Sequence, residues 1–293
     1  MRRAIRSHPP LNKEENSPMT AIEPSAVLES IGLTAYGKAI PLSGGDVGQV
    51  WRVDSDQGQV VVKHADTYMI QAEADGLHAL RGAGTRLIIP EIIGVLDDVL
   101  VTEYLESGRP SPTQLGEGLR QLHGVKGEQH GWPQNNASGT TQQSNTLSND
   151  GRIFQREQRL LPLGRACLEQ GRLDKRDMRN LEHVANTLEE WLPDAPASLL
   201  HGDLWSGNVL YSDRGPALID PAVYRHYPDV DIAMLELFGT PGAAFHEAYW
   251  NGQYPEDWTR RCALFQLYPL LNHLLLFGTT YRRAVQQALA QLR

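Results

Sequence analysis

The sequence is poor in cysteine, with only Cys167 and Cys262 in its 293 residues. The two lie far apart, and neither belongs to a Cys-x-x-Cys or His-rich pattern. We therefore expect neither a disulfide framework nor a structural zinc site, because both need several suitably spaced ligands. Two isolated thiols fit a reducing compartment, so we expect a cytoplasmic protein.

An excess of positive charge and long apolar runs are also missing. Lys and Arg total 27 against 35 Asp and Glu, which gives a formal net charge of −8 at pH 7. This balance argues against general binding to nucleic acid or to anionic membranes, but nucleotides need only a local cation and a metal. The most hydrophobic stretch, residues 264–277, is interrupted by Gln266, Asn272 and His273. It therefore predicts a buried helix and no membrane span.

The pattern of apolar residues predicts an α+β protein with a small lobe at 19–104. Residues 1–18 are basic and then polar without a hydrophobic segment, so we expect a disordered extension and no secretory signal. The small lobe alternates in a way typical of an antiparallel sheet with one long helix. Its expected strands are 38–42, 50–55, 59–64, 87–93 and 99–104. A short amphipathic helical pattern is expected within 20–36, and the long helix at 67–82.

Residues 105–112 contain Gly108, Arg109 and two prolines and mark the expected connector between lobes. Residues 113–293 predict a mostly helical second lobe. Its expected helices are 113–123, 151–170, 174–192, 230–238, 242–250 and 255–291. The polar segment 132–151 is too long for an ordinary turn, so we expect it to be either functional or disordered.

The segment from His201 to Asn208, His-Gly-Asp-Leu-Trp-Ser-Gly-Asn, contains side chains that phosphoryl transfer requires. Asp203 and Asn208 lie five positions apart on a tight loop, and the second strand of a predicted hairpin returns Asp220 beside them. In kinases such an Asp orients the acceptor hydroxyl, while the Asn and the later Asp hold Mg²⁺. The alternative is a silent loop in which the polar side chains bond to their own backbone. Because the site should be open to solvent, we expect no large pKa shift at Asp203.

The small lobe offers candidate groups for a nucleotide. Gly44 and Gly45 lie in a turn between strands, where backbone amides could approach phosphates, although a plain hairpin is an equal alternative. Lys63 ends an apolar strand, as does the kinase lysine that meets the α- and β-phosphates; the alternative is an exposed strand lysine. Glu73 on the next helix is its natural partner, and Asp75 should face solvent.

The strand that leads into the connector is the expected adenine site. Backbone groups of Glu103, Tyr104 and Leu105 occupy the position that meets the base in kinases. We therefore assign nucleotide binding to the small lobe, and the catalytic loop and acceptor site to the helical lobe.

With these motifs in place, the chain resembles the fructosamine kinase family, relatives of the aminoglycoside phosphotransferases with a protein-kinase-like fold. The resemblance covers residues 20–290 and is strongest at 201–208, 219–224, 228–239 and 246–250. It implies ATP-dependent phosphorylation of the 3-hydroxyl of a ketosamine, or glycated amine, whose unstable product releases the amine. By matching position, Asp203 would be the base, Asn208 and Asp220 the Mg²⁺ ligands, and Lys63 with Glu73 the nucleotide pair.

The resemblance also suggests roles around the catalytic loop. Trp205 is a candidate wall for the sugar-amine substrate, with a core tryptophan as the alternative. His201 and Asp231 should brace the loop through hydrogen bonds. A further set could line the acceptor cleft or serve only packing: Tyr224, His226 and Asp229.

Two other interpretations stay open at this point. One is a phosphotransferase for another small hydroxyl compound, such as an aminoglycoside, choline or a sugar. The other is a nucleotide-binding pseudoenzyme, against which the joint presence of Lys63, Asp203, Asn208 and Asp220 argues. The sequence does not identify the preferred ketosamine or distinguish a free acceptor from a protein-bound one. It also does not indicate the oligomeric state.

Overall fold

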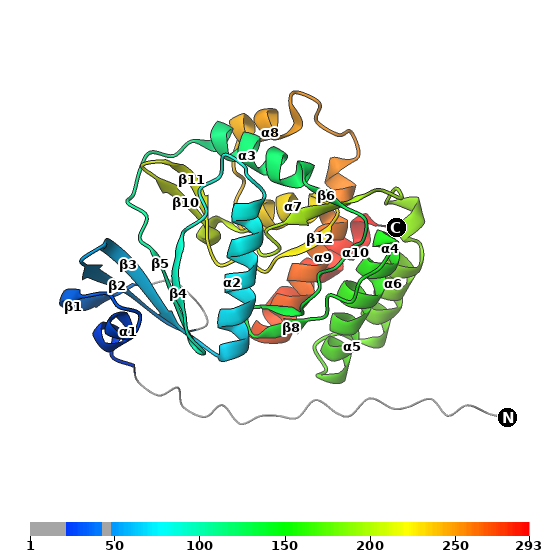
Figure 1. The fold of residues 1–293 in the computed structure, drawn as a ribbon. Coiled ribbons are helices and arrows are strands. Elements are labelled where there is room, and N and C mark those ends of the chain that lie inside the picture. Colours follow the sequence, from blue (N-terminus) through cyan, green and yellow to red (C-terminus); the bar gives the residue numbers. More distant parts are fainter. Residues whose placement is uncertain (1–21, 43–47, 293) are drawn as a thin grey trace.

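In the computed structural model, which describes residues 22–42 and 48–292, a five-stranded antiparallel sheet lies beside a larger helical part (Figure 1). The strand order is β1-β2-β3-β5-β4. The strands are β1 Ala35–Pro41, β2 Gln49–Ser55, β3 Gly58–His64, β4 Ile92–Val95 and β5 Val99–Glu103. Two helices accompany this sheet, α1 Pro24–Ser30 and α2 Thr67–Gly82. The α+β prediction is thus confirmed, and α2 has the expected bounds.

Alternation along β3 gives the sheet two different faces. Val60 and Val62 are fully buried and pack with Leu28 of α1 in a small apolar core. Lys63 is the next residue along the strand, so its side chain leaves from the opposite face, toward α2. The position of this lysine follows from the period of two along the strand.

The expected strand 87–93 is wrong over residues 87–91. β4 begins at Ile92, whereas Ile88 forms a parallel bridge to Ala217 in the other part of the molecule. The Ile88 N–H donates to the Pro216 carbonyl at 2.9 Å, and the Leu218 N–H donates to the Ile88 carbonyl at 3.0 Å. An apolar strand-like run is therefore divided between two sheets, which periodicity alone cannot reveal.

Helices dominate the rest of the chain. They are α3 Pro112–Gly124, α4 Gly151–Phe154, α5 Leu161–Glu169, α6 Lys175–Asn186, α7 Asp229–Leu237, α8 Ala243–Trp250, α9 Trp258–Phe277 and α10 Arg282–Gln291. A π-helical turn, Gln155–Leu160, separates α4 from α5. The expected helix 255–291 is interrupted at Gly278, whose φ of 91° ends α9.

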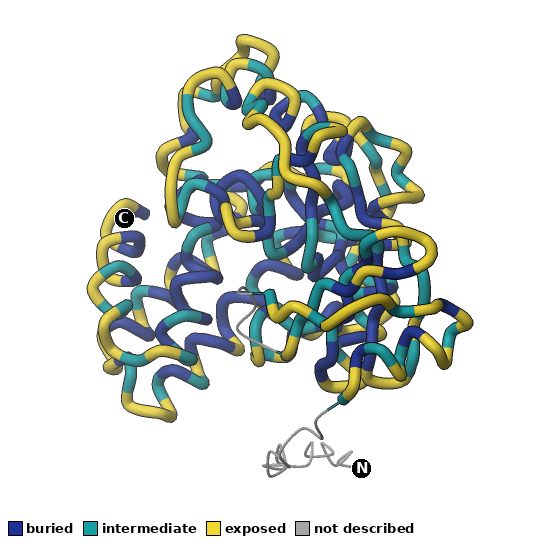
Figure 2. Tube along the Cα trace, turned by 90° about the vertical axis from the view of Figure 1, so that its left-hand side faces the viewer, coloured by how far each residue is buried: buried dark blue, intermediate teal, exposed yellow. Residues whose placement is uncertain are grey.

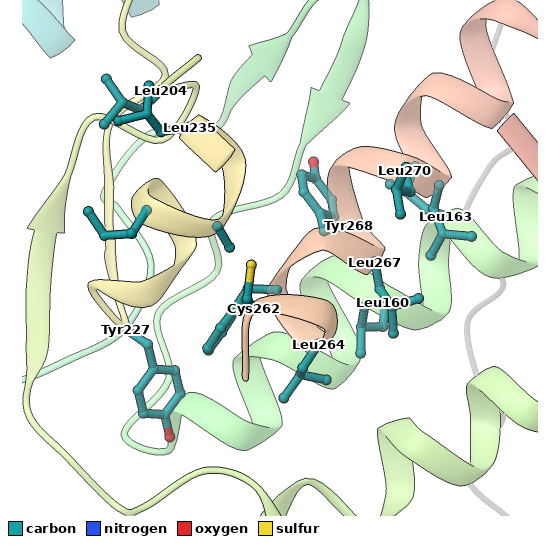
Figure 3. Packing of buried hydrophobic residues seen from close by; sticks show 14 of the residues in the cluster. Leu160, Leu163, Leu204, Tyr227, Leu235, Cys262, Leu264, Leu267, Tyr268 and Leu270 are labelled. Carbon is teal, nitrogen blue, oxygen red and sulfur yellow. The ribbon is translucent and has the colours of Figure 1, made fainter. Parts of the chain in front are cut away.

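α9 runs through the apolar core of the helical part. Its Leu264 and Leu267 are fully buried against the segment that contains Leu160 (Figure 3). Buried residues lie mostly in the interior of the molecule, while the outer turns are mostly exposed (Figure 2). The prediction of a buried helix at 264–277 is confirmed, and no helix within the described residues is long and apolar enough to cross a membrane.

Short strands complete the helical part. They are β6 Lys126–Gly127, β7 Asn136–Ser138, β8 Thr141–Gln143, β9 Ala197–Leu200, β10 Val209–Ser212, β11 Gly215–Leu218 and β12 Tyr224–His226. The long polar segment 132–151 is ordered, with β7 and β8 forming a hairpin. Arg159 anchors it, donating to the Ser144 carbonyl at 2.7 Å and to Asn145 Oδ1 at 2.7 Å.

The β10–β11 hairpin is joined to the connector between sheet and helices. The Gly108 N–H donates to the Tyr211 carbonyl at 2.7 Å, and the Asp213 N–H donates to the Glu106 carbonyl at 3.0 Å. A Cβ at position 108 would lie 2.1 Å from the Ser212 carbonyl oxygen, so only glycine permits this approach. The lobe boundaries at 19–104, 105–112 and 113–293 remain a prediction.

Candidate active site

The loop from His201 to Asn208 is held from beneath by a buried carboxylate. Asp231 of α7 accepts the His201 N–H at 2.7 Å and the Gly202 N–H at 2.9 Å, and His123 Nε2 lies 3.1 Å from it. The pKa of Asp231 lies below its usual value. Burial alone would raise it, but the hydrogen bonds with His123 and the loop amides favour the carboxylate more strongly. The ring of His201 bonds the Ile219 carbonyl at 2.9 Å. Both residues therefore brace the loop, as predicted.

Gly202 must be glycine for the loop to turn at this point. Its φ is 83°, and a Cβ would lie 2.0 Å from the Ala222 carbonyl oxygen. The turn directs Asp203 away from the core toward Ser138 of the β7–β8 hairpin, whose Oγ donates to Asp203 Oδ1 at 3.0 Å.

The carboxyl group of Asp203 has a raised pKa, contrary to expectation. Burial raises the pKa to about 6, the nearby charges of Asp220 and Asp231 act in the same direction, and the hydrogen bonds of Ser138 and Asn208 oppose them. The pKa is raised because the β7–β8 hairpin covers this carboxylate, which the sequence suggested would be open to solvent. Such a group can accept a proton near neutral pH.

Three residues from distant segments meet at one ion cluster. Lys63 Nζ lies 2.6 Å from Glu73 Oε2 and 2.8 Å from Asp220 Oδ1. Burial opposes the charge of Lys63, but the two carboxylates hold its pKa above the usual value. Burial raises the pKa of Glu73 and also opposes ionisation of Asp220, whose pKa Lys63 nevertheless lowers. The exposed-lysine alternative is therefore wrong, since the Lys63 side chain is only 14 % exposed.

Asn208 and Asp220 carry the side-chain oxygens of the expected cation site, which remains a prediction. The Asn208 Nδ2 donates to the Asp203 carbonyl at 2.8 Å, which leaves its side-chain oxygen for another ligand. Asp220 has a φ of 52°, a left-handed conformation that non-glycine residues rarely adopt and that is concentrated at functional sites. No cluster of three His, Cys, Asp or Glu side chains in the described ranges could hold a metal. One carboxylate and one amide oxygen instead fit Mg²⁺, which takes few protein ligands beside phosphates and water.

Of the three backbone N–H groups expected to meet adenine, two have partners within the protein. The N–H of Glu103 donates to the Glu91 carbonyl at 2.9 Å, and that of Tyr104 donates to the Gln59 carbonyl at 3.1 Å. Among the described residues, the N–H of Leu105 has no such partner. The side chain of Glu103 pairs with Arg214 at 2.8 Å. Gly44 and Gly45 lie outside the described residues.

Trp205 is a partly exposed residue of the catalytic loop. Its side chain is 39 % exposed, and its ring centroid lies 6.5 Å from that of Phe238, which is 40 % exposed. The core-tryptophan alternative is therefore wrong. The two partly exposed rings provide an apolar surface at the catalytic loop, in which Trp205 follows Asp203 by two residues.

Tyr224 and His226 were candidates for the acceptor cleft, and their burial places them in the core instead. They are 1 % and 0 % exposed, and their rings pack against other aromatic rings of the core. His226 Nδ1 lies 2.9 Å from His130 Nδ1, and its Nε2 lies 2.9 Å from Gln155 Oε1. Burial followed by the neighbouring charge of His130 lowers the pKa of His226 well below its usual value. These rings stabilise the core beneath the loop.

Two acidic residues also lie differently from expectation. Asp75 accepts a hydrogen bond from Trp132 Nε1 at 2.6 Å and is partly buried, because the 132–151 segment covers α2 at this point. Asp229 pairs with Arg261 at 3.1 Å and borders a surface hollow of about 460 Å³ whose other lining residues include His123 and Tyr249. This hollow contains none of the catalytic-loop residues, so we do not assign the acceptor to it.

Sequence reasoning missed two residues near the base. Ser138 bonds Asp203 directly, and Asn272 of α9 donates to the Ser138 carbonyl at 3.2 Å. Signals for both were present: the long polar segment was expected to be either functional or disordered, and Asn272 interrupts an otherwise apolar helix. Neither signal names the partner, because the contacts span distant parts of the chain.

Comparison with known proteins agrees with this geometry. The family model for fructosamine kinase matches residues 25–293. A probable ketoamine kinase of Thermus thermophilus is 34% identical over 274 residues, covering 92% of this chain and 99% of that protein. A crystal structure of a candidate fructosamine-3-kinase from Thermobifida fusca superposes with a TM-score of 0.84 at 30% identity, covering 92% of this chain and 97% of that one.

A more distant structure supports the fold alone. The ADP-bound aminoglycoside phosphotransferase APH(2'')-Ib superposes with a TM-score of 0.61 at 16% identity, over 91% of this chain and 94% of that one. The kinase-like architecture is therefore confirmed.

Proposed function

This chain belongs to the fructosamine kinase family, and we therefore propose that it transfers the γ-phosphoryl group of ATP to the 3-hydroxyl of ketosamines. Family membership supports ATP-dependent phosphoryl transfer to a ketoamine, while the 3-position and the consequence of the transfer are part of our proposal. The observation that carries it is the contact of Lys63 with both Glu73 and Asp220 beside the loop that presents Asp203. A silent scaffold has no need to bury this charged cluster, which is costly.

Asp203 would orient the acceptor hydroxyl and take its proton. Its raised pKa suits proton transfer near neutral pH, and Ser138 and Asn208 hold the carboxyl group by hydrogen bonds. Lys63, fixed by Glu73, would bind the phosphates of the nucleotide. The Leu105 N–H has no backbone partner among the described residues and is the group we assign to the adenine.

Asn208 and Asp220 would hold Mg²⁺. The ion, when bound, neutralises phosphate charge as the phosphoryl group moves. Asp220 would have to exchange its contact with Lys63 for the ion, and it is the more exposed carboxylate of the pair, at 35% against 13% for Glu73.

The proposed product is a ketosamine 3-phosphate, which breaks down and frees the amine. The protein would thus act in deglycation. Both of its cysteines are free and buried, in keeping with a reducing, cytoplasmic setting.

A panel of acceptors tests this function. Purified protein with Mg²⁺ and ATP should consume ATP with fructosamines or ribulosamines and not with aminoglycosides, choline or free sugars. Phosphorus NMR should show the new phosphate on the 3-oxygen. Turnover confined to another acceptor class would overturn the proposal, and nucleotide-dependent thermal stabilisation without any turnover would favour a pseudoenzyme.

A further inference from the structure

The β7–β8 hairpin brings uncharged polar side chains to the catalytic base. Ser138 Oγ donates to Asp203 Oδ1 at 3.0 Å. Asn272 Nδ2 donates to the Ser138 carbonyl at 3.2 Å and lies 3.5 Å from Ser138 Oγ. The amide of Asn272 is therefore one residue removed from the base, although it leaves from the buried helix α9.

Several of these polar groups lack a protein partner. Within residues 22–42 and 48–292, no hydrogen bond reaches Asn272 Oδ1, Asn136 Oδ1 or Thr141 Oγ1. Asn272 and Asn136 are only 3% and 4% exposed. A buried amide oxygen without a partner destabilises a fold, so the presence of two such oxygens on and next to the hairpin that contacts the base needs a functional reason.

We propose that Asn272 and the β7–β8 hairpin form the subsite for the uncharged polyhydroxyl chain of the acceptor. This inference rests on the proposed function and adds the residues that would select the substrate. Each sugar hydroxyl can both donate and accept a hydrogen bond, so such a chain matches a set of carboxamide and hydroxyl groups. Other buried polar groups in proteins are often satisfied by water, which is the alternative that the experiment must exclude.

The charge of the subsite selects against phosphorylated sugars. The polar residues of the hairpin and Asn272 are neutral, and Ser138 bonds the carboxylate of Asp203, while the guanidinium of Arg159 is already bonded to Ser144 and Asn145. A phosphate on the sugar chain would meet this negative charge without a cation from these residues. Ketosamines with a neutral sugar chain should therefore be the preferred acceptors over their sugar-phosphate counterparts.

The variant Asn272→Leu tests the role of the amide. Leucine has a similar volume and suits the apolar surroundings of α9, so the fold should persist. We expect the KM for the acceptor to rise about 10- to 100-fold, with the KM for ATP within about twofold of the wild type. Gln266→Leu is the matched control: Gln266 lies on the same helix and donates to the Ala233 carbonyl at 3.0 Å, away from the base. It should leave both KM values unchanged.

Deoxy acceptors make the test independent of the variant's folding. With wild-type protein, an acceptor lacking one hydroxyl other than the reacting one should lose about tenfold or more in kcat/KM. In Asn272→Leu the same deletion should cost nothing further, because the partner is already gone. Unchanged acceptor KM in Asn272→Leu, or a wild type indifferent to every deletion, would overturn the proposal and assign the amides to buried water.

The acceptor panel separates this result from the proposed function. If the wild type phosphorylates an aminoglycoside or a sugar and no ketosamine, the proposed function fails. The Asn272 comparison then proceeds with that polyhydroxyl acceptor, and the same rise in KM still supports the subsite.

Discussion

Replacing Asp203 by asparagine should make the protein more stable while abolishing turnover. The carboxyl group has a pKa of about 6 in the folded protein against 3.8 as its reference value. A carboxylate with a raised folded pKa is destabilising once ionised, at about 1.4 kcal/mol for each pH unit between the two pKa values. The cost at pH 7.5 is therefore up to about 3 kcal/mol, reduced by the partial exposure of the side chain.

The sign of the effect determines its pH dependence. Below the unfolded pKa both states hold the proton and Asp203 costs nothing; as pH rises through the folded pKa the full cost develops. The carboxamide introduced by Asp203→Asn would not titrate, and its oxygen can still accept the Ser138 hydroxyl. The stability advantage of Asp203→Asn should thus grow by about 1–2 kcal/mol between pH 5 and pH 7.5.

Paired urea denaturation of wild type and Asp203→Asn at these two pH values measures this growth. Nucleotide binding to the variant, followed by thermal shift, should persist while turnover is lost. In the wild type, kcat/KM should fall about tenfold per pH unit below pH 6 as the base protonates. A stability difference that stays constant or shrinks with rising pH would refute a raised pKa at Asp203, and retained turnover would refute its role as the base.

Other predictions concern the nucleotide site, the acceptor site and the core. Lys63→Met should lower kcat/KM for ATP by about 100-fold or more, and Glu73→Gln should lower it less, since the lysine charge remains; steady-state kinetics with variable ATP checks the order. Trp205→Ala should raise the acceptor KM about tenfold without changing the KM for ATP, because its ring is partly exposed beside the base; equal changes in both would contradict a specific acceptor contact. His226 has a depressed folded pKa, so the stability it contributes as a neutral ring is lost as pH falls below about 6.5. His226→Phe should lose less stability than the wild type between pH 7.5 and 5.5, as urea midpoints would show.

The chemistry of the site was predictable from the sequence because its residues lie in short motifs. Asp203, Asn208 and Asp220 are linked by one loop and one hairpin, so local spacing places them together. The pairing of Lys63 with Glu73 was inferred from the kinase pattern, and their 2.6 Å contact agrees with it. The 2.8 Å contact of Lys63 with Asp220 was not predicted.

The surroundings of the site were less predictable because they depend on contacts between distant segments. The pKa of Asp203 was expected to be normal, since nothing in its neighbourhood along the chain shows that Ser138 covers it. Tyr224 and His226 follow the motif directly but turn into the core, where the guanidinium carbon of Arg159 lies 4.2 Å from the ring centroid of Tyr224. Their orientation is decided by the packing of the helices, which periodicity over three residues cannot encode.

The β10–β11 hairpin has a mechanical consequence. It begins directly after Asn208 and ends shortly before Asp220. Its strand β11 is hydrogen-bonded to Ile88, and its strand β10 is hydrogen-bonded to Gly108 of the connector. Any hinge motion between the sheet and the helices must therefore carry this hairpin along with the connector. Such a motion should change the distance between the sheet and the acceptor site in the helical part, while the backbone segments that carry Lys63, Asn208 and Asp220 stay at a nearly constant distance from one another.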